Sequence, residues 1–206
     1  MLPAALEACD LAKSYGGSPL FSQLSFRAET GLIAVAGRNG SGKTTLLKIL
    51  AGLARPDEGS VHVERAGAGL SGEARRLAIG WAGPDLNFYE DLTARENLTF
   101  FRRAAGRSTS ADEIGERLAD VGLGPAADQR VGTFSTGMKQ RLRLGFALLF
   151  DPPILLLDEP MAGLDLSGRE TVLRQLAVRR LTGAVVLASN DERDFVQPDQ
   201  VVELGR

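Results

Sequence analysis

A glycine-rich segment constrains the fold of this chain more than any other feature. It runs Gly37-Arg38-Asn39-Gly40-Ser41-Gly42-Lys43-Thr44-Thr45 and matches the phosphate-loop pattern G-x-x-x-x-G-K-[ST]. The apolar stretch 32–36 before it is long enough for one buried strand. The stretch 46–52 after it is apolar at helical spacing and ends in a glycine suited to a helix C-terminus. The pattern predicts a strand, a glycine loop and a helix in succession.

The residue types in this loop suit a nucleoside triphosphate. Gly40 and Gly42 let main-chain N–H groups approach a phosphate without a Cβ in the way. The helix N-terminus adds partial positive charge, Lys43 can reach the β- and γ-phosphates, and Thr44 can offer a hydroxyl to Mg²⁺. The alternative is a glycine-rich turn that happens to precede a helix. We favour the nucleotide site.

Composition limits the class of protein. The 206 residues include 24 basic and 26 acidic side chains, for a formal net charge of −2. A chain that binds a nucleic-acid backbone normally presents a basic face, so this balance argues against nucleic acid as the main partner. The single cysteine, Cys9, excludes an internal disulfide and a cysteine-based zinc site.

Nothing in the sequence predicts a membrane span or a leader. No apolar run approaches the ~18 residues that a membrane-spanning helix needs. The first residues lack the basic region of a signal peptide. We therefore expect a cytoplasmic chain, with docking on a membrane protein left open.

The first part of the chain is rich in predicted strands. Residues 6–15 and 20–29 are expected to form two strands joined by a turn, and 60–65 and 77–82 another pair. Between the members of the second pair, 67–72 matches G-x-G-x-x-G. That motif is weak by itself, and we interpret the segment as a connection between strands.

The pattern becomes helical from residue 93 to about 150. Thr93–Glu96 is a capping box before an apolar periodic run, and Ser110 opens another helix that should end at Gly122. After that part, we expect a helix at 167–180 and strands at 154–157, 184–188 and 200–204.

This order predicts an α/β fold: a P-loop NTPase core with a mostly parallel sheet, an antiparallel β subdomain and an inserted helical subdomain. We expect a single domain over 1–206. The core and the β subdomain would take 1–92 and 151–206, and the helical subdomain 93–150.

Two carboxylates follow the apolar strand 154–157. Four apolar residues in a row suit a strand buried on both faces, with Asp158 and Glu159 emerging at its C-terminal end. Beside a phosphate loop, Asp158 can hold Mg²⁺ and Glu159 can polarise the attacking water. The segment Phe134-Ser135-Thr136-Gly137-Met138 precedes an amphipathic helix, and Ser135 is a plausible N-cap. An exposed helix N-terminus at this point is also an anion site.

Taken together, these motifs resemble the ATPase subunit of ABC transporters over essentially the whole chain. Five motifs stand in the family's order: the aromatic Tyr15 ahead of the loop, the phosphate loop 37–45, the signature 134–138, the carboxylates Asp158 and Glu159, and the segment 163–165. The resemblance implies an adenine stacked on Tyr15, Mg²⁺ held by Thr44 and Asp158, and Glu159 and Lys43 as catalytic residues. It also implies a head-to-tail dimer that sandwiches two ATP molecules. Each γ-phosphate would lie between one subunit's phosphate loop and the other subunit's Ser135 and Gly137.

The sequence departs from the family pattern at three places. In the signature, Thr136 and Met138 replace a glycine and a glutamine, while Ser135 and Gly137 remain. The family's glutamine loop has no glutamine here: Pro84 or Asp85 stands at that point, and either Asp85 or Asn87 is a candidate substitute. Asn190 occupies the position of the switch histidine, and the chain's only histidine, His62, lies in a predicted strand. Asn190 can donate a neutral hydrogen bond but cannot carry a proton. We therefore expect Asn190 to be a third catalytic residue, with ATP binding retained and hydrolysis retained but slower.

We expect an ATP-binding and hydrolysing subunit that powers transport by a separate transmembrane permease, with export favoured over import. Two alternatives stay open: a module that dimerises on ATP with little hydrolysis, and an ABC-type ATPase that serves no transporter. The second ATPase subunit of the dimer is either another copy or a different chain.

Overall fold

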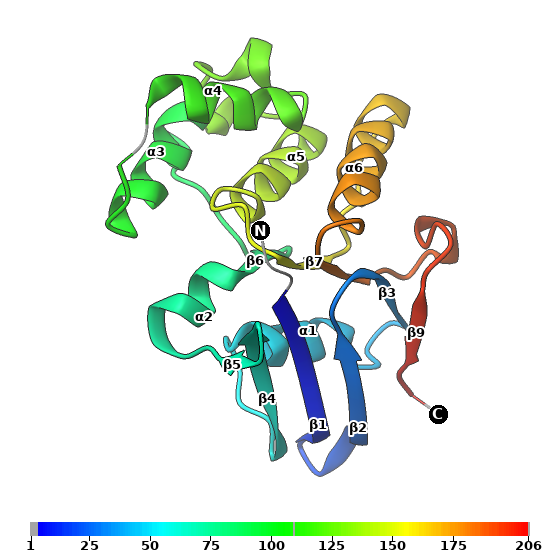
Figure 1. Cartoon of the computed structure of the whole chain (residues 1–206). Helices are drawn as coiled ribbons and strands as arrows, with labels where there is room; N and C mark the ends of the chain where they lie inside the picture. Colours follow the sequence, from blue (N-terminus) through cyan, green and yellow to red (C-terminus); the bar gives the residue numbers. More distant parts are fainter. Residues whose placement is uncertain (1–3, 109, 206) are drawn as a thin grey trace.

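The predicted strand, loop and helix form the centre of a five-stranded sheet. The computed structural model describes residues 4–108 and 110–205 (Figure 1). Strand β3 (Gly31–Ala36) leads through the loop into helix α1 (Lys43–Ala51), which ends at Gly52 in a left-handed conformation. The other strands of this sheet are β6 (Ile79–Ala82), β7 (Ile154–Asp158), β8 (Ala184–Ala188) and β9 (Gln200–Glu203). The order is β6-β7-β8-β3-β9, and every neighbouring pair is parallel.

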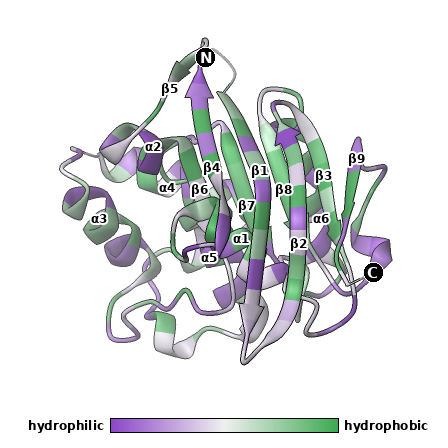
Figure 2. Cartoon of the chain, turned by 90° about the horizontal axis from the view of Figure 1, so that it is seen from below, coloured by the Kyte–Doolittle hydropathy of each residue, from purple (hydrophilic) through white to green (hydrophobic). Residues whose placement is uncertain are grey.

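A second, antiparallel sheet packs against this core. It has the order β2-β1-β4-β5, formed by β1 (Ala4–Tyr15), β2 (Ser18–Ala28), β4 (Glu58–Arg65) and β5 (Ala68–Gly69). In Figure 2 its long strands β1 and β2 lie in front of the parallel strands, and β1 contacts both β7 and β8. Apolar residues of β1 and β2 share one buried cluster with Leu46 and Leu50 of α1 and with Leu156 of β7.

Helices lie on the opposite side of the parallel sheet. These are α3 (Ala94–Ala104), α4 (Ala111–Asp120), α5 (Thr136–Ala147) and α6 (Leu166–Arg179), with short 3₁₀ turns at Gly124–Ala126, Val131–Thr133 and Glu192–Asp194 (Figure 1). Helices α5 and α6 contact the strands of this sheet, and α4 packs on α5 and on α3. Because side chains alternate along a strand, Leu155 and Leu157 of β7 face this helical cluster whereas Leu156 faces the other one. The uninterrupted apolar run of β7 is therefore buried on both sides. Within the described residues, no helix is long and apolar enough to cross a membrane.

The predicted helix starts are confirmed. Thr93 and Ser110 both form complete capping boxes, with Glu96 and Glu113 as the returning carboxylates. Such caps satisfy two otherwise unpaired N–H groups at each helix start. The mixed α/β fold with one parallel and one antiparallel sheet also agrees with the prediction.

One prediction was wrong. Residues 60–65 and 77–82 do not form a pair of strands, because β4 belongs to the antiparallel sheet and β6 to the parallel one. A short helix, α2 (Gly72–Ala78), lies between them and takes residues 77 and 78. Its Glu, Ala, Arg and Leu residues are good helix formers. The glycines at 67–72 drew the sequence interpretation towards a simple connection, yet 68–69 forms β5 against β4.

Asn97 braces the segment that leads into the helices. Its side chain is fully buried, accepts a hydrogen bond from the Tyr89 N–H at 2.9 Å, and donates to the Tyr89 and Thr93 carbonyls at 3.0 and 2.9 Å. The contacts fasten the chain just after β6 to the first turn of α3. A buried polar group without a hydrogen-bond partner destabilises the folded state. These hydrogen bonds therefore contribute more to the free energy of unfolding than their number suggests.

We predict that Asn97→Ala lowers the free energy of unfolding by about 1–3 kcal/mol, because it leaves the Tyr89 N–H without its partner. It also removes the side-chain donor to the Tyr89 and Thr93 carbonyls, which keep only the main-chain N–H groups of Leu92 and Asn97. Thr99→Ala, on the same helix at a half-buried position, is the control. Denaturant unfolding of both variants checks the difference, and equal losses would contradict it.

Candidate active site

The phosphate loop wraps around the ammonium group of Lys43. The Lys43 side chain is buried, and its Nζ donates to the Gly37 carbonyl at 2.7 Å, the Arg38 carbonyl at 3.2 Å and Asn190 Oδ1 at 2.6 Å. An ammonium group has three protons, so each finds an oxygen. All three oxygens are neutral, and the site therefore presents a positive charge that a phosphate can neutralise.

Glycine is required where the loop turns into α1. Gly42, the N-cap of α1, has φ 99°, a conformation that strains any residue with a Cβ. A Cβ there would also lie 3.1 Å from the Leu20 side chain. Gly40 has φ 81° and open space around it, so its main chain is accessible to a ligand. This agrees with a loop whose N–H groups face a phosphate.

Asp158 and Thr44 form a pair of oxygen ligands beside the loop. Asp158 ends β7 with its side chain buried, and the Thr44 hydroxyl donates to Asp158 Oδ2 at 2.6 Å. Burial raises the pKa of the Asp158 carboxyl, an effect that the hydrogen bond from Thr44 opposes. Mg²⁺ prefers oxygen ligands and usually combines one or two protein ligands with water and substrate phosphates. The pair fits that ion, and no group of three or more His, Cys, Asp or Glu side chains among the described residues forms a metal cage.

Glu159 follows directly and presents a free oxygen. Its backbone has φ 51°, an unusual conformation for a residue with a side chain, and its N–H donates to the Ala188 carbonyl at 2.8 Å. Within the described part of the chain, Oε1 is buried and has no hydrogen-bond partner. Burial raises the pKa of this carboxyl, against the hydrogen bond from Ser189. Glu159 also lines a cleft, and a rotation of its carboxylate towards that cleft would let Oε1 bind a water molecule.

Ser189 and Asn190 approach the two carboxylates from the end of β8. Ser189 Oγ lies 2.6 Å from Asp194 Oδ2 and 3.2 Å from Glu159 Oε2. The hydroxyl has a single proton, which lies within reach of both carboxylates, and the contact with Asp194 is the shorter of the two. Asp194 in turn is paired with Arg169 of α6. Asn190 uses its carbonyl oxygen to hold Lys43, which a protonated imidazole could not do.

These residues line one cleft of about 350 Å³. Its predicted members are Tyr15, Asn39, Gly40, Gly42, Lys43, Thr44, Thr45, Asp158, Glu159 and Asn190. Gly37 and Arg38 contribute only the carbonyls that hold Lys43, and Ser41 does not line the cleft. Tyr15 is 58% exposed, and the Lys13 ammonium lies 5.3 Å from its ring centre. A ring held open at the mouth of the cleft is free to stack on a planar base.

Sequence reasoning missed two lining residues, Leu20 and Pro84. Leu20 comes from β2, and only the packing of the antiparallel sheet on the core brings it here. Pro84 has a side chain that cannot be a ligand, and the sequence offers Asp85 and Asn87 as substitutes for the missing glutamine. Neither of those lines the cleft: Asp85 pairs with Lys48 at 2.9 Å, and Asn87 Nδ2 donates to the Asp85 carbonyl.

Ser135 and Gly137 lie outside this cleft, at the start of α5. Ser135 is exposed, and its hydroxyl caps the helix by accepting from the Met138 N–H at 3.2 Å. Gly137 packs against the segment 163–165, where a Cβ on it would meet the Gly163 carbonyl at 3.2 Å. One chain therefore does not bring its own signature to its own phosphate loop.

A family model described as ABC transporter matches residues 21–162, more than half of the chain. The chain belongs to the ABC transporter family. This confirms the resemblance inferred from the motifs, and it identifies the chain as an ATP-binding domain of that family.

Curated ABC transporter proteins from several bacteria are similar to the chain. An uncharacterised ABC transporter ATP-binding protein, YxlF of Bacillus subtilis (strain 168), is 41% identical over 93% of this chain and 65% of its own length. The Nod factor export ATP-binding protein I of Rhizobium sp. (strain N33) is 34% identical over 91% and 62%. The molybdenum import ATP-binding protein ModC of Brucella abortus (strain 2308) is 39% identical over 73% and 43%. The chain thus spans less than two thirds of the length of these relatives.

Solved ABC structures share the fold. An ATP-binding subunit of an ABC transporter has a TM-score of 0.80 at 27% identity, covering 99% of this chain and 86% of that one. A bacterial ABC transporter cassette described as dimeric has a TM-score of 0.84 at 23% identity, covering 97% and 94%.

We predict that Glu159→Gln raises the melting temperature of the nucleotide-free chain by about 2–4 °C at pH 8, because it removes a charge that burial disfavours. The folded pKa lies above the unfolded one, so this penalty is present above the folded pKa and is lost as pH falls through it. The gain should therefore shrink as the pH falls from 8 through the raised pKa of Glu159.

Glu116→Gln at an exposed position of α4 is the control for removing a negative charge. Differential scanning calorimetry of both variants checks the prediction. A gain for Glu159→Gln that is absent, or that grows as the pH falls, would contradict it.

Proposed function

We propose that this chain binds and hydrolyses ATP and thereby powers transport through a separate transmembrane permease. One observation carries the proposal: a charged phosphate loop, a pair of oxygen ligands and a carboxylate with a free oxygen share a single cleft. These groups account for phosphate binding, Mg²⁺ binding and activation of water, and a second subunit supplies the remaining contacts to the γ-phosphate.

The residues divide the work as follows. Lys43 exchanges its carbonyl contacts for the β- and γ-phosphates, and Gly40 and Gly42 leave room for N–H groups to bind them. Thr44 and Asp158 hold Mg²⁺, which supplies charge neutralisation at the phosphates. Glu159 orients a water through its free oxygen and accepts a proton from it as the water attacks.

Asn190 stands at the position of the family's switch histidine, a residue that can carry a charge. Its amide binds Lys43 in the nucleotide-free chain and turns to donate a neutral hydrogen bond to the γ-phosphate when ATP enters. A neutral donor stabilises the developing negative charge less than a charged one. We therefore infer slow hydrolysis rather than none. The alternative function is dimerisation on ATP with little turnover, and it differs from the proposed function only in the rate of ATP hydrolysis.

A second subunit completes the site. The exposed N-terminus of α5 offers Ser135 and free N–H groups to an anion, and it lies away from the chain's own phosphate loop. We infer a head-to-tail dimer, of two copies or of this chain with a different ATPase subunit, in which each α5 faces the partner's γ-phosphate. In this arrangement, residues 93–150 act as the helical subdomain of a single ATPase domain.

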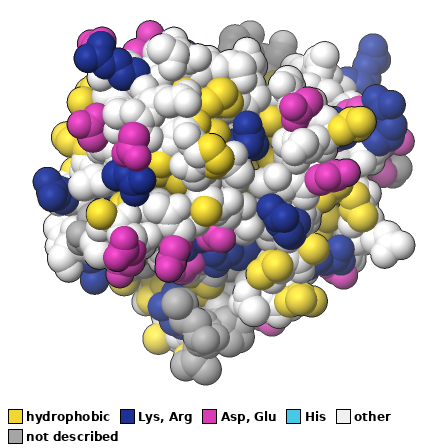
Figure 3. Space-filling view, turned by 90° about the horizontal axis from the view of Figure 1, so that it is seen from above, with side chains coloured by type: hydrophobic (Ala, Val, Ile, Leu, Met, Phe, Trp, Pro, Cys, Tyr) yellow, Lys and Arg dark blue, Asp and Glu magenta, His cyan; other side chains and the backbone are white. Residues whose placement is uncertain are grey.

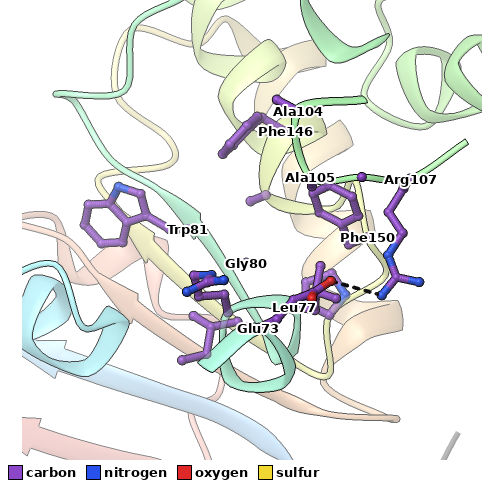
Figure 4. Close-up of a pocket in the computed structure, with 14 residues that line it drawn as sticks. Glu73, Leu77, Gly80, Trp81, Ala104, Ala105, Arg107, Phe146 and Phe150 are labelled. Atoms are coloured by element: carbon purple, nitrogen blue, oxygen red, sulfur yellow. Dashed lines mark ion pairs between the residues drawn. The ribbon is translucent and has the colours of Figure 1, made fainter. Parts of the chain in front are cut away.

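The permease is expected at a groove beside β6. This groove of about 880 Å³ lies between α2, the end of α3 and the end of α5 (Figure 4). Trp81, Phe146 and Phe150 give it an aromatic lining, and an ion pair between Arg107 and Glu73 spans one side. Such a surface suits a short amphipathic segment from the cytoplasmic side of a membrane protein, and would place the chain at that face of the membrane.

Two further expectations follow from the surface and the relatives. Figure 3 shows Lys and Arg interspersed with Asp and Glu over the helical end of the molecule, and we infer no nucleic-acid partner. We propose export as the direction of transport, on the altered segment 81–92 and on the Met-Lys-Gln-Arg sequence at 138–141. The names of the similar proteins include both export and import.

We predict that the purified chain hydrolyses Mg-ATP slowly and that Glu159→Gln lowers kcat by at least about 100-fold, since the water loses its base. Asn190→His should raise kcat several-fold by restoring a donor that can carry charge. Steady-state phosphate release measures both, with equilibrium ATP binding as the check that each variant still binds. Turnover equal in wild type and Glu159→Gln would contradict the assignment of Glu159.

A further inference from the structure

The segment 83–86 lies between the nucleotide cleft and the groove. Pro84 lines the cleft, whereas Trp81, just before the segment, lines the groove. The indole of Trp81 packs directly on Gly83, where a Cβ would be 2.3 Å from the ring. A shift of this segment therefore moves a wall of the cleft and the chain's only tryptophan together.

Arg143 of α5 holds this segment by its main chain. Its Nε donates to the Leu86 carbonyl at 3.0 Å and its Nη2 to the Pro84 carbonyl at 3.2 Å. The planar guanidinium can bind two acceptors at once, which an ammonium group on a flexible stem does less well. The position of 84–86 is thus tied to α5.

The third contact of Arg143 leads towards Glu159. Nη1 donates to Gln140 Oε1 at 2.9 Å, and Gln140 Nε2 donates to the Glu159 carbonyl at 2.9 Å. Gln140 is only 7% exposed, so water does not compete readily for these bonds. Glu159 has the left-handed backbone φ of 51°, and its carbonyl is thereby fixed by a side chain from another element.

The chemistry of Arg143 is unusual for a half-buried arginine. Among the described residues, its guanidinium donates to three uncharged oxygens, those of Pro84, Leu86 and Gln140. Burial lowers the pKa of the Arg143 guanidinium, and the charge of Asp85 opposes that effect. The role of Arg143 is therefore to position the groups that it contacts, although the burial of its charge is unfavourable and no close ion pair with a described residue offsets it.

We propose that Arg143 is a positioning residue for hydrolysis: acting through Gln140, it couples the position of segment 84–86 to the backbone of Glu159. The proposal rests on the proposed function, in which Glu159 activates water. Arg143 thus links segment 84–86 to the nucleotide cleft. Neither Asp85 nor Asn87 provides such a link, because Asp85 pairs with Lys48 and Asn87 binds the Asp85 carbonyl. A displaced segment would pull Gln140 and rotate the Glu159 carboxylate away from the water.

The test compares Arg143→Met with Arg141→Met. Arg141 lies on the same helix and also donates to a main-chain carbonyl, that of Gly122 at 2.7 Å, but this contact leads away from the cleft. Both variants lose an arginine from α5 and keep a side chain of similar reach. Circular dichroism and melting temperature show whether each one folds.

We expect Arg143→Met to lower kcat by about 10- to 100-fold, as a misplaced reacting group does, with ATP affinity within about twofold of wild type. Arg141→Met should keep the wild-type kcat. Mg-ATP binding should also change Trp81 fluorescence in wild type and Arg141→Met, and this change should be lost in Arg143→Met. Because the fluorescence needs no turnover, it tests the coupling even in a chain that binds ATP without hydrolysing it.

Gln140→Leu provides a second route to the same answer if Arg143→Met does not fold. It should lower kcat to a similar degree. The kcat of the double variant should fall no further than that of the more damaged single variant, because both substitutions break the same chain of hydrogen bonds from Arg143 to Glu159. Equal kcat and equal fluorescence change in Arg143→Met and Arg141→Met would overturn the proposal. So would a loss of ATP affinity that accounts for the whole loss of activity. A chain that does not bind ATP at all would instead overturn the proposed function.

Discussion

A buried ammonium group held by neutral oxygens is the interaction on which the site depends. Lys43 cannot remain in its position without acceptors, and the loop supplies two carbonyls by turning at glycines while β8 supplies the third through Asn190. The charge stays without a counter-ion among these contacts. A polyphosphate provides that counter-ion, so the same geometry that closes the loop on itself also prepares it for a nucleotide.

The sheet brings the remaining chemistry to this point. In a parallel sheet the carboxyl ends of neighbouring strands lie along one edge, so the ends of β3, β7 and β8 deliver Lys43, Asp158 and Asn190 to one cleft. Apolar side chains on both faces of β7 keep that strand rigid, and its burial also raises the pKa values of Asp158 and Glu159. The burial of β7 therefore both stabilises the core and shifts the pKa values of the two carboxylates at the edge of the sheet.

Most of this could be read from the sequence because it is local. The phosphate loop, the capping boxes at Thr93 and Ser110 and the carboxylates after β7 are each set by spacing along the chain. The rest depends on contacts between distant segments. Leu20 reaches the cleft only through sheet packing, and the path from Arg143 to Glu159 joins α5 to two loops. Helix α2 was missed because adjacent glycines masked a short run of helix formers.

The central claim is that the catalytic site is shared between two chains. Lys43→Ala removes the phosphate contact, and Gly137→Asp places a carboxylate at the start of α5, where a partner's γ-phosphate would bind. Because a Cβ at this position lies 3.2 Å from the Gly163 carbonyl, circular dichroism and melting temperature first show that the variant folds. The decisive measurement is Mg-ATP hydrolysis by each variant alone and by an equal mixture. Half of the dimers in the mixture hold one intact site, so we predict two inactive variants that regain about a quarter of the wild-type rate when mixed. Full activity of Gly137→Asp alone, or a mixture no more active than its parts, would contradict the shared site.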